Sequence, residues 1–99
     1  SGQRPLEAGA RTWLGVCAAG RNDWNRCDEE LERANELLQE TGYVDGDIAR
    51  GFFKVGVLTE QSGELVIARD ALKLAIRQWE ALGRSQDSEP ARERLNALS

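Results

Sequence analysis

Few side chains in this sequence are suited to catalysis or to metal binding. The chain has 99 residues and no histidine, so neither a Ser-His-Asp nor a Cys-His catalytic arrangement can form within it. The two cysteines, Cys17 and Cys27, do not form a CxxC pair, and a structural zinc ion needs four ligands. We therefore predict that the protein is not an enzyme and holds no cofactor and no metal ion.

The carboxylates are numerous, but their spacing is not that of a metal site. A carboxylate-bridged metal centre in a helical bundle needs Glu-x-x-His pairs, which are absent. Arg26 and Arg33 alternate with the acidic residues, which favours a solvated face. Asp45-Gly46-Asp47 is similar to the start of a calcium loop, but the remaining EF-hand positions do not match. The acidic cluster consists of Asp28, Glu29, Glu30, Glu32 and Glu36.

The composition narrows the class of partner and the cellular setting. Thirteen basic and 17 acidic residues give a formal charge of −4. Because a nucleic-acid binder normally carries a basic excess, we predict no nucleic-acid partner. No apolar run approaches the ~18 residues of a membrane span. Two cysteines and no signal sequence predict a cytoplasmic protein. We expect both cysteines to be small buried side chains, with a disulfide as the alternative.

The sequence matches itself when it is shifted by 41 residues, and such internal similarity is typical of repeat architectures. Gly15 then aligns with Gly56 and Ala34 with Ala75. Small residues meet small ones, and large apolar residues meet large ones. Further matched pairs are Leu14 with Val55, Trp24 with Leu65, Cys27 with Ala68, Leu31 with Leu72, and Gly42 with Gly83.

Each of the two matching halves of the sequence predicts two helices. Three- and four-residue apolar spacing indicates helices over residues 5–19, 24–40, 48–61 and 65–82, and a short last helix over 89–98. Asn22 or Asp23 is expected to cap the second helix and Asp47 the third, and Gly42 ends the second helix. The predicted fold is all-α, with antiparallel helix pairs over 5–42 and 47–83 and a capping helix or truncated third unit over 89–98.

These positions carry a resemblance to the tetratricopeptide repeat, whose pattern is W-x2-L-G-x2-Y followed by A-x3-F and a later alanine. The second half has Phe52-x2-Val55-Gly56-x2-Thr59, then Ala68-x3-Leu72 and Ala75; the first has Arg11-x2-Leu14-Gly15-x2-Ala18, then Cys27-x3-Leu31 and Ala34. The spacing of 41 differs from the usual 34, so the resemblance is to the longer repeats of this superfamily. Arg11 in the tryptophan position predicts that the first unit lies at an edge.

The resemblance implies a partner surface on the first helix of each unit. The matching positions are Thr12, Trp13, Val16, Arg50, Phe53, Lys54, Val57 and Glu60. Trp13 and Phe53 lie off the helix face that Leu14, Phe52 and Val55 are expected to commit to the core. Exposed aromatic side chains are common binding anchors. Arg50 and Lys54, one turn apart, could bind an acidic or C-terminal carboxylate group.

Each of these residues also has a structural interpretation. Trp13 could pack under the N-terminal segment or under a preceding repeat, and Phe53 could be buried against the last helix. Arg50 and Lys54 could form a solvated face near Glu60. We therefore expect an interaction module that binds a partner peptide or helix. The alternative is a structural or self-associating segment of a larger helical-repeat scaffold, and a homo-oligomer fits either function.

Overall fold

The computed structural model describes residues 3–98, and this part of the chain is helical without strands. The prediction of an all-α fold is therefore confirmed. None of the described helices has the length and apolar character that crossing a membrane requires. The elements are α1 (Gln3–Gly20), α2 (Trp24–Thr41), α3 (Gly46–Gln61), α4 (Leu65–Ala81), the 3₁₀ helix η1 (Ser85–Ser88) and α5 (Glu89–Ala97).

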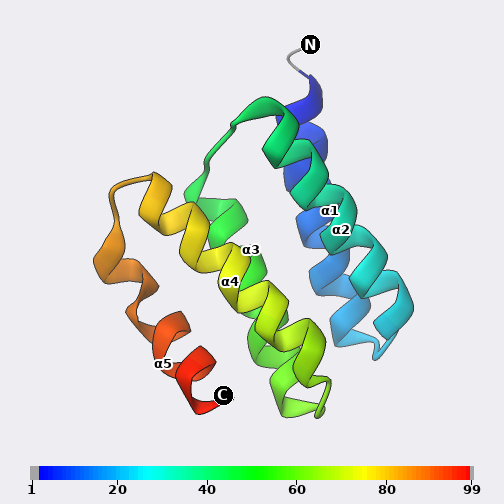
Figure 1. The fold of residues 1–99 in the computed structure, drawn as a ribbon. Coiled ribbons are helices and arrows are strands. Elements are labelled where there is room, and N and C mark those ends of the chain that lie inside the picture. Colours follow the sequence, from blue (N-terminus) through cyan, green and yellow to red (C-terminus); the bar gives the residue numbers. More distant parts are fainter. Residues whose placement is uncertain (1–2, 99) are drawn as a thin grey trace.

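The helices form two antiparallel hairpins placed side by side (Figure 1). Within the hairpins, α1 packs along α2 and α3 packs along α4. Between the hairpins, α1 packs closely on α3, whereas α2 and α4 scarcely touch. The last helix, α5, packs mainly on α4 together with η1. The two inter-hairpin contacts differ, so the α2 and α4 side of the molecule is open where the α1 and α3 side is closed.

The turns inside the two hairpins have equivalent geometry. Asn22 and Gly63, which are 41 positions apart, both adopt the left-handed conformation, with φ of 59° and 79°. Such a residue at the end of a helix, followed by an amide that reaches back five residues, is a Schellman motif. The amides that reach back belong to Asp23, bonded to Ala18 at 2.9 Å, and Glu64, bonded to Thr59 at 2.8 Å.

The two repeated glycines also have equivalent surroundings. A Cβ placed on Gly15 would lie 3.6 Å from Cδ2 of Leu31, and one on Gly56 would lie 2.6 Å from Cδ2 of Leu72. Leu31 and Leu72 are themselves 41 positions apart. At Gly56 the absence of a side chain is what lets the first helix approach the second so closely, whereas a Cβ at position 15 would make ordinary contact. The same ideal Cβ atoms lie 3.8 Å from the carbonyl oxygen of Cys27 and 3.6 Å from that of Ala68, again a matched pair.

The caps agree with the prediction at α2 and differ at α3. The Asp23 side chain accepts a hydrogen bond from the Arg26 amide, and Gly42 ends α2 with φ of 68°. At α3, however, the N-cap is Asp45, whose side chain accepts from the amides of Asp47 and Ile48. The helix therefore begins at residue 46, earlier than predicted, and Asp47 lies in its first turn, where a negative charge is favourable.

Two residues expected in the core are exposed. Leu14 is 43% exposed, whereas Val55 at the matching position is fully buried. The difference arises because Val55 belongs to the middle of the row of helices, while α1 has no described neighbour on the corresponding side. Cys17 is likewise exposed and Cys27 is buried, and both are free thiols. The prediction of burial was thus right for Cys27 and wrong for Cys17 and Leu14.

The outer face of the first hairpin carries an ion-pair network. Arg11, in the slot that buried Phe52 takes in the second unit, lies 3.0 Å from Glu30 and 3.5 Å from Glu7. Glu30 is almost fully buried and also lies 3.5 Å from Arg26. An apolar helix pair stacked here would have to desolvate these charges, which is costly. The network therefore makes this face of the first hairpin polar.

Candidate partner-binding surfaces

Thr12, the first residue of the predicted surface, lies inside the contact between α1 and α3. Its side chain is fully buried, and its hydroxyl donates a hydrogen bond to the Ala8 carbonyl at 2.9 Å. A Cβ on Gly51 of α3 would lie only 2.6 Å from Cγ2 of Thr12. Thr12 therefore joins the two hairpins and presents no surface to a partner.

Trp13, Arg50 and Lys54 come together on an exposed face. Trp13 is 39% exposed, and its ring lies 3.4 Å from the Cβ position of Gly51. Arg50 and Lys54, which flank Gly51 on α3, are exposed. Arg50 forms an ion pair with Asp47 on the same helix, while Lys54 forms none among residues 3–98. This face is the part of the predicted surface that remains accessible.

The other predicted residues of α3 are partly covered by the C-terminal part of the chain. Phe53 packs against Trp79 with ring centroids 5.9 Å apart and an interplanar angle of 60°. The Arg94 guanidinium of α5 lies 5.9 Å from the Phe53 ring centroid and 2.9 Å from the Glu60 carboxylate. The interpretation that Phe53 packs against the last helix agrees with this arrangement. Val16 and Val57 are half-buried.

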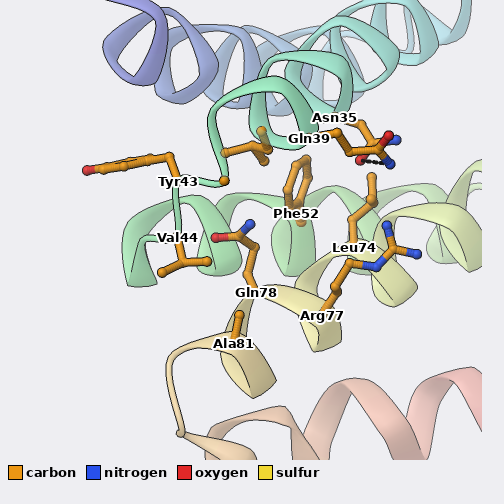
Figure 2. Close-up of a pocket in the computed structure, with 11 residues that line it drawn as sticks. Asn35, Gln39, Tyr43, Val44, Phe52, Leu74, Arg77, Gln78 and Ala81 are labelled. Atoms are coloured by element: carbon orange, nitrogen blue, oxygen red, sulfur yellow. Dashed lines mark hydrogen bonds between the residues drawn. The ribbon is translucent and has the colours of Figure 1, made fainter. Parts of the chain in front are cut away.

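A groove between α2 and α4 was not predicted from the sequence. Its floor is apolar, because Leu31, Leu38 and Phe52 are nearly or fully buried there and Leu74 is half-buried beside them. Two adjoining hollows, of about 230 and 280 Å³, share Leu74 and several wall residues. Figure 2 shows Phe52 and Leu74 between the polar side chains of the two helices.

The walls of the α2–α4 groove carry amides and charges. The shared wall residues are Asn35 and Gln39 on α2 and Arg77 on α4. The Gln39 amide donates to the Asn35 side-chain oxygen at 3.4 Å, which is a long and weak bond. Toward one end lie Asp28 and Glu32 on α2 and Asp70 and Lys73 on α4. None of the charged side chains in these walls forms an ion pair within the described chain, so the charges are available to a partner.

The loop after α2 closes the other end of the groove and is held in place by Asp45. The Asp45 amide donates to the side-chain oxygen of the buried Gln78 at 2.9 Å, and the Tyr43 hydroxyl donates to the Asp45 carboxylate at 3.0 Å. That hydrogen bond, with the nearby negative charge, raises the pKa of Tyr43. The loop is thereby fixed to α4, so this end of the groove is preformed.

A sequence signal for the groove exists in the spacing of polar residues. Asp28, Glu32, Asn35 and Gln39 follow steps of four, three and four, which places them on one helix face. The acidic members of this set were interpreted as a solvated face because the splay of α2 from α4 is not encoded in either helix alone. No protein-family model, curated protein or solved structure matches this chain at a significant level.

Proposed function

We propose that this protein is a protein–protein interaction module that holds an extended segment of a partner protein in the α2–α4 groove. The observation that carries the proposal is a preformed apolar floor bounded by unpaired charges on both walls. We further propose that the two hairpins are units of the long tetratricopeptide type. Their matched turns and matched glycine contacts, 41 residues apart, support that assignment.

The size of the groove favours a short extended peptide. Its lining runs from Asp28 to Gly42 on α2, which at 1.5 Å per residue is about 21 Å. An extended chain advances about 3.3 Å per residue, so about six residues span this length. Each of the two hollows is smaller than the ~300 Å³ at which pockets for drug-sized ligands begin.

The wall chemistry suits a peptide backbone and charged side chains. The carboxamides of Asn35 and Gln39 both donate and accept hydrogen bonds, as main-chain amides and carbonyls require. Lys73 and Arg77 on α4 would pair with acidic side chains of the partner, and guanidinium groups bind carboxylates bidentately. Apolar partner side chains would cover Leu74. The expected ligand is therefore a peptide segment that contains apolar residues, with acidic side chains opposite Lys73 and Arg77 and basic ones opposite Asp28 and Glu32.

The proposal is tested by changing the charge on each of the two candidate surfaces. The groove variant is Lys73→Glu with Arg77→Glu, and the matched control is Arg50→Glu with Lys54→Glu on the face beside Trp13. Both exchange one lysine and one exposed arginine, so the net charge changes equally. Partners are recovered by affinity capture with mass spectrometry and then titrated as purified proteins against both variants.

We expect the groove variant to lose the partner and the control to bind it with unchanged affinity. Two lost charge-assisted contacts, each contributing about 1.5–3 kcal/mol, correspond to a weakening of at least a hundredfold. The opposite pattern would assign binding to the first-helix surface and would refute the groove. Circular dichroism of both variants verifies that the helices are retained.

A further inference from the structure

An uninterrupted apolar stripe runs along the exposed side of α1. Leu6 is 76% exposed, Trp13 is 39% exposed, and Ala10 and Cys17 are also exposed. In chain order Leu6, Ala10, Trp13 and Cys17 follow steps of four, three and four residues, which is the spacing of a coiled-coil seam. Thr12 and Gly15 lie on the faces of α1 that contact α3 and α2. Within the stripe, the Trp13 ring also touches α3 beside Gly51, while Leu6, Ala10 and Cys17 remain exposed.

We propose that a second copy of this chain packs on the stripe, with the two α1 helices antiparallel around a two-fold axis. The middle of the stripe lies between positions 11 and 12. An axis there brings Leu6 of each copy onto Cys17 of the other, and Trp13 of each onto Ala10 of the other. Each contact thus pairs a large side chain with a small one, as close packing of facing helices requires.

The charges on α3 fit the same axis. Gly9 lies next to Ile48 and Gly51 lies next to Thr12, so α1 and α3 run in parallel with an offset of 39 positions. In the repeat, Asp47 and Lys54 take the slots of Leu6 and Trp13, and therefore face the same side as the stripe.

The axis between positions 11 and 12 of α1 passes between positions 50 and 51 of α3. It therefore brings Asp47 of each copy opposite Lys54 of the other, which is an attractive arrangement. Arg50 lies close to the axis, so the two copies bring their Arg50 side chains near each other, and the ion pair with Asp47 of the same chain partly neutralises each of them. An isologous interface needs a surface that is complementary to itself, and the apolar residues together with the Asp47–Lys54 contacts meet this requirement.

The stripe lies on α1 and the proposed peptide groove lies between α2 and α4, so the dimer leaves the groove open. This inference does not depend on the proposed function, and either can fail without the other. Burial in the dimer would also remove from water the Leu6 side chain and the exposed part of Trp13, which face solvent in the single chain.

The first test is the molar mass of the full chain across a concentration series, measured by light scattering after gel filtration. Leu6→Glu places a charge in the seam, whereas Val66→Glu alters an equally exposed residue, 70% accessible, on α4. We expect the wild type and Val66→Glu to have the mass of two chains and Leu6→Glu that of one. A wild type that stays monomeric at the highest concentration, or a Leu6→Glu variant that stays dimeric, would overturn the proposal.

The second test fixes the orientation of the helices through cysteine cross-linking. In the antiparallel dimer the two Cys17 residues are about 16 Å apart along the helix axis, too far for a disulfide, whose Cα atoms lie within about 7 Å. Leu6→Cys, in contrast, lies opposite Cys17 of the other copy. Mild oxidation is expected to cross-link Leu6→Cys and neither the wild type nor the Leu6→Cys, Cys17→Ser variant. Cross-linked wild type would show a parallel pairing and refute the two-fold axis.

Discussion

The two repeated glycines give a matched pair of alanine substitutions with opposite expected effects. Gly15 and Gly56 occupy the same position in their hairpins, but the space beside them differs. A Cβ at position 15 meets its nearest atom at 3.6 Å, which is ordinary van der Waals contact. A Cβ at position 56 would lie 2.6 Å from Cδ2 and 2.8 Å from Cγ of Leu72. Because Leu72 is fully buried, it has no free space into which to move.

The magnitudes follow from two opposing contributions. Replacing glycine by alanine inside a helix stabilises by about 1 kcal/mol. Overpacking a filled core destabilises by about 1–3 kcal/mol. Gly15→Ala should therefore raise the free energy of unfolding by about 1 kcal/mol. Gly56→Ala gains the same helical contribution but must displace Leu72, so it should fall about 1–3 kcal/mol below Gly15→Ala.

Urea unfolding followed by circular dichroism at 222 nm measures both variants against the wild type. For a domain of this size, 1 kcal/mol corresponds to about 4–8 °C in Tm, so thermal melts give an independent comparison. Equal stability changes in the two variants, or a Gly56→Ala that is more stable than Gly15→Ala, would refute the account of helix packing. Wild-type m-values in both variants are the control for two-state unfolding.

Four further predictions concern single residues. Burial, together with the negative charges of Asp28 and Asp23, raises the pKa of Cys27 from 9.0 to about 11. The thiol therefore ionises at lower pH in the unfolded chain than in the folded one, so the free energy of unfolding should fall between pH 9 and 11. Urea titrations should show this fall in the wild type and a smaller one in Cys27→Ala. In the monomeric Leu6→Glu variant, a thiol reagent at pH 8 should modify Cys17, which is exposed in the single chain, much faster than Cys27. Arg94→Ala removes the Glu60 ion pair and should lower stability by about 0.5–1 kcal/mol, whereas Asn22→Gly relieves a positive φ and should raise Tm slightly.

The repeat and its turns could be predicted because they depend on local residue types. The match of Gly15 with Gly56 follows from small residues recurring in step, and the structure adds that the turn residues Asn22 and Gly63 are both left-handed. The earlier start of α3 at residue 46 was missed because Asp45 and Asp47 are equally good caps by type. Only the fold shows that Asp45 is held by Gln78 of α4.

The surfaces could not be predicted because they depend on how the hairpins meet. Thr12 seemed suited to a groove, but Gly51 admits α1 so closely that Thr12 is buried. Leu14 on α1 seemed suited to the core by analogy with Val55 on α3, yet within the described chain only α3 has a neighbouring helix, α1, on that side. The α2–α4 groove arises from the same close contact, since α1 and α3 meet at Gly51 while α2 and α4 remain apart.

The most direct test of the groove is chemical-shift mapping of the ¹⁵N-labelled chain during titration with the peptide segment recovered from a captured partner. The amides of Asn35, Gln39, Lys73 and Arg77 are expected to shift together and saturate at one affinity. The amides of Arg50 and Lys54 should stay in place. Shifts confined to Trp13, Arg50 and Lys54, with the α2 and α4 amides unchanged, would contradict the central claim.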